Sequence, residues 1–199
     1  TSKLTLSFNG NFGSTKQMLV TGNITDNASD PSKKLALEIL DTVGNGSRSF
    51  NVFLEGANSY SGGTTVDANS ILHGTTNSLQ GDITNNGTVL FDQTINHGGA
   101  ISAGTYAGAI GGSGNLTKQA AGTVTLTGAN TYTGQTAVTG GTLALGATGS
   151  LATTNIAISA GTINGSGTIT SVINGDTSQA IQLSGTGRLN ISGLTLNLS

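Results

Sequence analysis

The sequence of 199 residues has no cysteine and no tryptophan, one proline, one methionine and little charge. Without cysteine the chain cannot form a disulfide framework or a cysteine-ligated zinc site. Seven Lys and Arg residues against nine Asp and Glu residues give a net charge of −2, which leaves no basic patch for nucleic acid. No apolar run approaches the roughly 18 residues that a membrane-spanning helix requires.

Glycine, threonine, serine and asparagine together fill just over half of the sequence. All four are poor residues for the interior of a helix, so the composition argues against a helical protein. A disordered chain and a regular all-β protein remain. Disordered chains usually have high net charge and few β-branched residues, whereas this chain is nearly neutral and rich in Val, Ile and Thr.

Apolar residues alternate with polar residues in many short segments, which is the pattern of half-buried strands. Most of these segments are three to six residues long and are bounded by Gly or Asn. Examples are Leu4/Leu6/Phe8, Leu35/Leu37/Ile39, Phe50/Val52/Leu54, Val124/Leu126, Leu143/Leu145, Ile156/Ile158 and Leu194/Leu196/Leu198.

One segment of the sequence occurs twice. The shared pattern, L-x-G-A-N-x-Y-[ST]-G-x-T-x-V, begins at Leu54 and again at Leu126. The pattern's other recurring positions, to which we assign structural roles, are Gly56, Asn58, Tyr60, Gly62, Thr64, Gly128, Asn130, Tyr132, Gly134 and Thr136.

The interval from Leu54 to Leu126 is too long for one supersecondary unit, and it divides into three coils of about 24 residues. Coils of this size with short strands and Gly or Asn corners predict an all-β fold, a right-handed parallel β-helix of about eight or nine coils. Glycine supplies positive φ at corners, and threonine suits outward strand positions.

The segment from Gly114 to Leu143 also resembles a known family. It contains Gly-Asn-Leu-Thr-Lys at 114–118, the repeat pattern at 122–134 and Gly-Gly-Thr-Leu at 140–143. These motifs resemble the passenger-associated transport repeat of bacterial autotransporters, and a degraded copy lies at 48–66. One departure is Gln119-Ala120-Ala121, because a glycine is usual after Lys118.

The resemblance implies a β-helical passenger exposed on the bacterial cell surface or secreted by the type V route. It also implies a C-terminal translocator β-barrel in the full-length protein. No signal peptide is recognised, and we expect the chain to be an internal piece of a passenger. We predict one β-helical unit over 1–199, with repeat units near 48–80 and 114–151.

Candidate catalytic residues are sparse. His97 follows Asp92 by five residues and lies near Ser102, so a hydrolytic set can be written down, but no nucleophile-elbow motif supports it. His73 and His97 are interpreted as loop histidines. We therefore predict no catalytic residue, no cofactor and no metal site.

The sequence gives little support for two kinds of site that need the same residue on successive coils, namely stacked carboxylates and a threonine array. Among the acidic residues, Asp67 and Asp92 are separated by about one predicted coil and could stack on adjacent coils, but Asp82 falls elsewhere on a coil. Thr123, Thr125 and Thr127 suggest an ice-binding array. Because the residues at the same places in the first repeat are not threonines, we expect no repeating array.

Ten of the sixteen charged residues lie within residues 1–55, and the most polar window, 26–34, contains the only proline. A solvated loop between coils is one interpretation. The other is a projecting loop that binds a partner, because loops on rigid scaffolds often carry recognition. Its candidate contact residues are Asp26, Asn27, Asp30, Lys33 and Lys34.

These observations favour a non-enzymatic passenger segment of an autotransporter adhesin. The segment would act as a rigid stalk, as an adhesive or self-associating surface, and as an aid to folding during secretion. Its partner would be a host-cell surface or matrix ligand, or another bacterium. The alternative is part of a secreted hydrolase, lyase or toxin whose active site lies elsewhere in the passenger.

Overall fold

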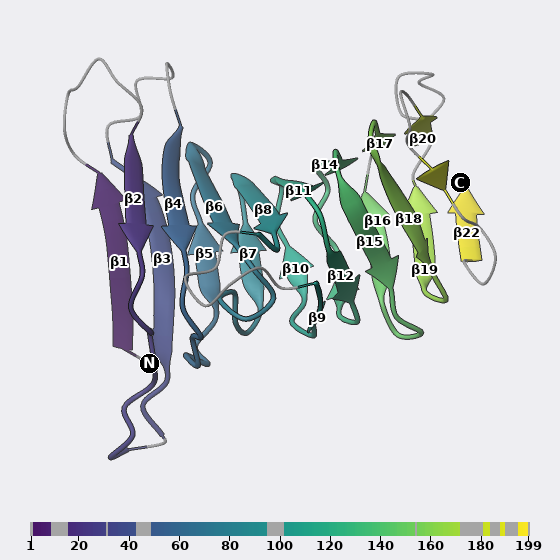
Figure 1. Ribbon diagram of the computed structural model, residues 1–199. Helices are drawn as coiled ribbons and strands as arrows, with labels where there is room; N and C mark the ends of the chain where they lie inside the picture. The colour runs from purple at the N-terminus through teal and green to yellow at the C-terminus, as the bar shows by residue number, and fades with distance from the viewer. Residues whose placement is uncertain are drawn as a thin grey trace.

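A computed structural model describes residues 2–8, 16–30, 32–42, 49–94, 102–153, 155–171, 181–183, 188–189 and 195–198. Within these residues the structure is all-β, and every strand pair is parallel. Short strands stack coil upon coil from one end of the chain to the other (Figure 1). This arrangement confirms the predicted parallel β-helix, whereas its right-handedness stays a prediction.

One continuous sheet, here called the long sheet, contributes one strand to each of eight coils in the described part of the chain. Its strands, in spatial order, are β2 (Gln17–Val20), β4 (Phe50–Leu54), β6 (Ser70–Gly74), β8 (Thr88–Asp92), β11 (Asn115–Gln119), β14 (Gln135–Val138), β17 (Asn155–Ile158) and β20 (Ile181–Leu183).

Three shorter sheets complete the coils. The N-terminal sheet contains β1 (Ser2–Phe8), β3 (Leu35–Asp41), β5 (Thr64–Val66), β7 (Ile83–Asn85) and β10 (Ile110–Gly111). The C-terminal sheet contains β13 (Ala129–Asn130), β16 (Ser150–Thr153), β19 (Thr168–Ser171) and β22 (Thr195–Leu198). The middle sheet contains β9 (Ala103–Tyr106), β12 (Thr123–Leu126), β15 (Gly141–Leu145), β18 (Gly161–Gly165) and β21 (Arg188–Leu189).

The core consists of files of inward side chains that run from coil to coil. In the long sheet one file passes through consecutive in-register positions and is fully buried: Val52, Leu72, Val89, Leu116, Thr136 and Ile156. Burying each large aliphatic side chain contributes roughly 1.5–3 kcal/mol relative to exposure. Because each coil buries its apolar residues against the coils above and below, the core has no single centre.

The coils differ in length and do not all have the predicted size. Leu116 pairs with Thr136, and Gln135 pairs with Asn155, in each case twenty residues later. The shortest step in the long sheet joins Ile71 to Thr88, and the longest joins Met18 to Val52. Corners of different length cause this variation, since the strands stay in register while the connections absorb the difference.

The two sequence repeats consequently lie on different faces of the β-helix. Leu54 ends β4 in the long sheet, whereas Leu126 ends β12 in the middle sheet. Thr64 begins β5 in the N-terminal sheet, whereas Thr136 lies in the long sheet. The interval between the repeats therefore spans three coils and one additional face, and not three complete coils.

Candidate functional site

The element shared by both repeats is a corner built around a buried asparagine. The Asn58 Oδ1 atom accepts a hydrogen bond from the Ile24 backbone N–H at 2.7 Å, and its Nδ2 donates to the Ser78 carbonyl at 2.7 Å. Asn130 does the same with the Ile110 N–H at 3.0 Å and the Ser150 carbonyl at 2.9 Å. Each amide thus connects the coil below to the coil above, and satisfies backbone groups that would otherwise be buried without partners.

A tyrosine and a threonine complete each corner. The hydroxyls of Tyr60 and Thr64 are 2.8 Å apart, and those of Tyr132 and Thr136 are 2.6 Å apart. Both tyrosine rings are fully buried. Burial raises the pKa of both phenols above the usual value of about 10, so they stay neutral.

Glycine is required where a corner lies directly on the coil beneath. A Cβ atom added to Gly134 would lie 2.2 Å from the Gly114 carbonyl oxygen, and one added to Gly62 would lie 2.6 Å from the Leu35 backbone. The recurring asparagines, tyrosines and threonines thus make hydrogen bonds within and between coils, and their role in stability stays a prediction.

Lys118 lies in the core, although lysine is rarely buried. It occupies an inward file between Phe91 and Val138 and is fully buried. Its Nζ donates to the backbone carbonyls of Gln119, Ala120, Ala121 and Gly140 at 2.7, 2.9, 3.4 and 3.2 Å. Burial lowers the pKa of Lys118, and the Asp92 carboxylate opposes that shift. The lysine of the Leu-Thr-Lys motif thus binds the backbone carbonyls of a corner from the core side.

Ala120 lies in the segment at which the resemblance expects a glycine. Its φ of 56° is in the left-handed region, which is unfavourable for residues with a Cβ. The Lys118 ammonium binds the Ala120 carbonyl and so holds this corner in place.

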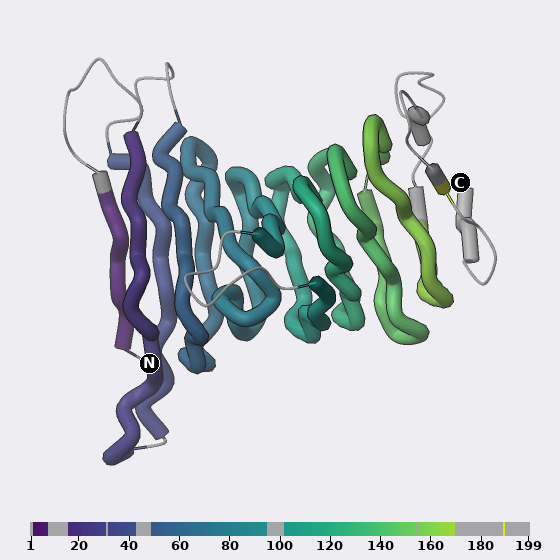
Figure 2. The backbone as a smooth tube through the Cα atoms, in the orientation of Figure 1, coloured from purple at the N-terminus to yellow at the C-terminus, as the bar shows by residue number. Residues whose placement is uncertain are grey.

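The predicted contact loop at 26–34 connects β2 to β3 and extends away from the stacked coils (Figure 2). Asp26 anchors its base. The Asp26 carboxylate accepts hydrogen bonds from the Leu35 N–H at 2.7 Å, the Ser61 N–H at 3.1 Å and the Ser61 hydroxyl at 2.6 Å. The Ser61 hydroxyl is the largest cause of a lowered pKa at Asp26.

Two further residues of the loop shape its turn. Asn27 Oδ1 accepts a hydrogen bond from the Ser29 N–H at 2.9 Å, and Asp30 Oδ1 accepts one from the Ser32 hydroxyl at 2.6 Å. Lys33 and Lys34 are exposed, and the Lys33 ammonium lies 3.5 Å from Asp30 Oδ2. The base and the turn of the loop are therefore held by hydrogen bonds. Its last two residues along the chain, Lys33 and Lys34, remain accessible.

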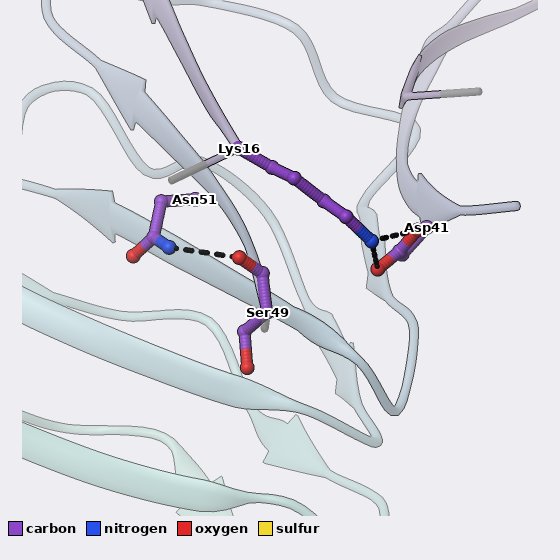
Figure 3. Close-up of polar contacts among 4 residues, drawn as sticks. All are labelled: Lys16, Asp41, Ser49 and Asn51. Atoms are coloured by element: carbon purple, nitrogen blue, oxygen red, sulfur yellow. Dashed lines mark hydrogen bonds and ion pairs between the residues drawn. The ribbon is translucent and has the colours of Figure 1, made fainter. Parts of the chain in front are cut away.

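Sequence reasoning missed a buried ion pair near the N-terminal end. Lys16 Nζ lies 2.8 and 3.1 Å from the two carboxylate oxygens of Asp41, and both side chains are almost completely buried (Figure 3). Both residues were counted only as part of the charged N-terminal region. Their separation along the chain carries no local signal, because the connection between β2 and β3 determines which positions meet.

His73 lies on the outer side of the long sheet. Its ring stacks on Phe53 with centroids 4.1 Å apart, and its Nε2 lies 2.9 Å from Asn51 Oδ1. Because Asn51 Nδ2 donates to the Ser49 carbonyl at 3.0 Å (Figure 3), Oδ1 is the acceptor and His73 Nε2 carries the hydrogen. Burial lowers the pKa of His73 to about 4, and the Asp92 carboxylate opposes this shift.

Of the hydrolytic set written from the sequence, the structure describes Asp92 and Ser102. Asp92 binds the Thr94 N–H at 2.9 Å and the Gln119 amide at 2.9 Å, and also the Thr94 hydroxyl. Ser102 is exposed, and His97 lies outside the described residues.

The possible stacking of Asp67 on Asp92 does not occur. Asp67 follows β5 of the N-terminal sheet, whereas Asp92 ends β8 of the long sheet. Val66 pairs with Asn85 on the next coil, so the chain has already entered another sheet when it reaches Asp92. The residues that the structure describes also contain no group of three His, Cys, Asp or Glu side chains arranged to hold a metal ion.

The expectation of no repeating threonine array is wrong for one file. Thr123 pairs with Thr142, and Thr142 pairs with Thr162, on the middle sheet. The neighbouring file changes from Thr125 to Ala144 and Asn164. The array was missed because the comparison used the spacing of the two sequence repeats and not the spacing of successive coils.

Comparison with known proteins identifies the repeat. Residues 52–68 and 116–145 match the family model of the passenger-associated transport repeat, which is found in autotransporter passenger domains. That repeat implies an exported protein, located at the cell surface or secreted. Searches of curated proteins and of solved structures found no match. In the described part of the chain no helix has the length and apolar character to span a membrane.

The buried asparagine of the second repeat gives a test of the corner. We expect Asn130→Ala to lower the free energy of unfolding by about 2–4 kcal/mol, because it removes the hydrogen bonds that the side-chain amide makes with the buried Ile110 N–H and the Ser150 carbonyl. Asn77→Ala, at an exposed asparagine, is the matched control and should change stability by less than about 0.5 kcal/mol. Urea unfolding of the two variants and the parent measures both, and equal stability of the variants would contradict the assigned role.

His73 should make stability depend on pH. Its folded pKa, about 4, is below the unfolded value of 6.5, so the unfolded chain binds the proton first and stability falls as the pH drops between those values. His73→Gln can keep a side-chain N–H near Asn51 but cannot titrate. Between pH 7 and pH 4.5 the parent should lose more stability in urea unfolding than this variant, and identical losses would sink the prediction.

Proposed function

We propose that this chain, which carries two passenger-associated transport repeats, is a non-enzymatic segment of an autotransporter adhesin. It serves as a rigid β-helical stalk that presents an adhesive or self-associating surface outside the cell. The full-length protein would use a translocator β-barrel for export, and stacking of the coils would aid passenger folding during secretion.

The stalk role is supported by the continuity of the long sheet. Eight strands stack in register, and the inward file from Val52 to Ile156 contains no exposed member. Buried hydrogen bonds of Asn58 and Asn130 link each repeat to the coils on both sides. A solenoid of this kind resists bending because each coil contacts its neighbours over a complete turn.

Coil-by-coil burial also supports the folding role. Each added coil covers the apolar file of the preceding coil, so a chain emerging at the outer surface would gain stability with every turn. The Lys118 ammonium binds carbonyls of residues 119–121 in its own corner and the Gly140 carbonyl of the next coil, so the last of these hydrogen bonds forms only after the next coil has formed.

The adhesive role is supported by the loop at 26–34. Asp26 fixes the base of the loop to the following coil through Ser61. Lys33 and Lys34, the last two residues of the loop along the chain, remain exposed. A fixed loop loses little conformational entropy on binding. Many copies on one cell surface would add avidity to a weak individual contact.

The partner expected for this loop is anionic, because two adjacent lysines face solvent. We expect Lys33→Gln combined with Lys34→Gln to reduce adhesion of bacteria displaying the intact passenger by several-fold. Lys3→Gln, which removes an exposed cation outside the loop, is the matched control and should leave adhesion unchanged. Host-cell binding and sedimentation of bacterial aggregates are measured at equal surface display.

Deletion of the loop provides the decisive comparison. If bacteria that display the passenger without 26–34 adhere and aggregate as the parent does, the loop is not the adhesive element. Retention of a hydrolytic or lytic activity by the passenger, with no change in adhesion on removal of the whole segment, would contradict the non-enzymatic adhesin.

A further inference from the structure

One file of outward side chains on the long sheet, here called the step file, changes in size along the stalk. Its members occupy consecutive in-register positions on β2 to β17: Leu19, Phe53, His73, Leu90, Thr117, Ala137 and Ala157. The first four members are large, and the last three are small. The outer face of the long sheet therefore has a raised half on β2 to β8 and a low half on β11 to β17.

The raised half is apolar and reaches solvent. Leu19, with 56% of its surface exposed, is the most exposed large apolar side chain among the described residues. Phe53, Ile71 and Leu90 are half-buried, although the inward apolar residues of the same strands are fully buried. Apolar side chains gathered on an outer face mark contact surfaces. The stacking of the coils does not account for them, because it buries the inward files.

The aromatic rings of the raised half stand upright on the sheet. The Phe53 and His73 rings are stacked, with centroids 4.1 Å apart and planes inclined by 19°, so each ring covers one face of the other. Leu19 and Leu90 occupy the register positions on either side of this pair. The rings therefore present their edges to solvent. A sugar stacks on an open ring face, so this surface favours a flat apolar partner over a carbohydrate.

The same face carries almost no charge. Among its described positions on β2 to β17 the one carboxylate is Asp92, which is nearly buried and accepts hydrogen bonds from Thr94 and Gln119. His73 is neutral near pH 7, because burial lowers its pKa to about 4. Most members of the other outward file are amides: Gln17, Asn51, Asn115, Gln135 and Asn155. Amides both donate and accept, so a second copy of this face would meet neither like charges nor mismatched polar groups.

The step file is complementary to itself when the order of the coils is reversed. A two-fold axis parallel to the strands reverses that order and keeps each outward file opposite its own copy. With the axis between β8 and β11, Leu90 of one copy lies over Thr117 of the other. Likewise His73 lies over Ala137 of the second copy. The raised half of each copy thus fits the low half of the other, whereas a parallel arrangement would place large residues over large residues.

We propose that the outer face of the long sheet binds the same face of a second copy of this chain, with the order of the coils reversed. This inference rests on the proposed function, since it names the surface of self-association, and it needs only coils that have already stacked outside the cell. Seven strands of about four residues give a footprint of roughly 450 Å² per copy, below the roughly 800 Å² of a stable complex. Each contact is therefore weak, and many copies on one surface supply avidity.

Sedimentation equilibrium of the purified chain, at concentrations up to about 1 mM, measures the contact. We expect the parent to self-associate reversibly. Leu90→Glu places an uncompensated charge in the contact and should weaken association at least tenfold, as a rough estimate. Thr125→Glu, at a half-buried outward position of the middle sheet, is the matched control and should leave association unchanged. Circular dichroism checks that both variants keep the strand content of the parent.

A charge pair tests the reversed order of the coils. Mixing the Leu90→Glu chain with a Thr117→Lys chain brings opposite charges together in the reversed arrangement, so the mixture should associate more strongly than either variant alone. Mixing Leu90→Glu with Leu90→Lys would restore association only in a parallel arrangement. Failure of the first mixture to restore association overturns the proposal. So does a parent that stays monomeric, whether its outer face then binds phospholipid vesicles, a glycan array or neither.

The interface and the adhesive loop can fail separately. At equal surface display of the intact passenger, Leu90→Glu should reduce the sedimentation of bacterial aggregates several-fold. Host-cell binding through the loop at 26–34 should be unchanged, because the substitution lies on another part of the molecule. Unchanged aggregation of the Leu90→Glu bacteria would contradict the proposed interface and would leave the adhesive role of the loop standing.

Discussion

The stacking of one coil on the next at the strand spacing of about 4.8 Å is the constraint on which the rest of this structure depends. At that distance the backbone of one corner lies directly on the backbone of the corner beneath, and there is room for glycine but little else, as at Gly134 above Gly114. The same distance lets one asparagine amide reach two coils, as Asn58 and Asn130 do. Polar groups that would be costly to bury thereby hold the coils in register.

Charged side chains that enter this stack do so only with dedicated partners. Lys118 fills an inward file with its aliphatic chain and satisfies its ammonium with four carbonyls. Lys16 and Asp41 neutralise one another near the other end. Loss of one partner from such a pair is strongly destabilising, because the other charge is left buried and uncompensated. The accessible charge at the surface is reduced accordingly, in keeping with a stalk of neutral, polar outer faces.

Much of the fold could be predicted because the signals are local. Alternation identifies the strands, and Gly and Asn identify the corners, as the paired positions of β4, β12 and β14 confirm. The length of each coil could not be predicted in the same way. The repeat specifies which residues build a corner around Asn58 or Asn130. It does not specify which two sheets of the β-helix that corner connects. The length of each connection decides the face, and a connection such as that between Met18 and Val52 leaves no periodic signal.

For the candidate sites, too, local features could be predicted from the sequence, whereas contacts between coils could not. The loop at 26–34 was found from composition, whereas the anchoring of Asp26 by Ser61 depends on the following coil and was not visible in sequence. The threonine file from Thr123 to Thr162 was missed because its members are spaced by coil steps and not by the sequence repeat.

Cross-linking tests the central claim, that coils in this region are stacked in register at twenty-residue steps, most directly. The chain has no cysteine of its own, so a pair introduced by Gln135→Cys and Asn155→Cys reports only on β14 and β17. In-register neighbours lie within the Cα separation of a disulfide, and we expect this pair to oxidise rapidly in the folded chain and slowly in urea. Gln135→Cys with Ser159→Cys, whose separation matches the coil length predicted from the sequence, should stay reduced. The opposite pattern, or no difference between the pairs, would contradict the coil assignment.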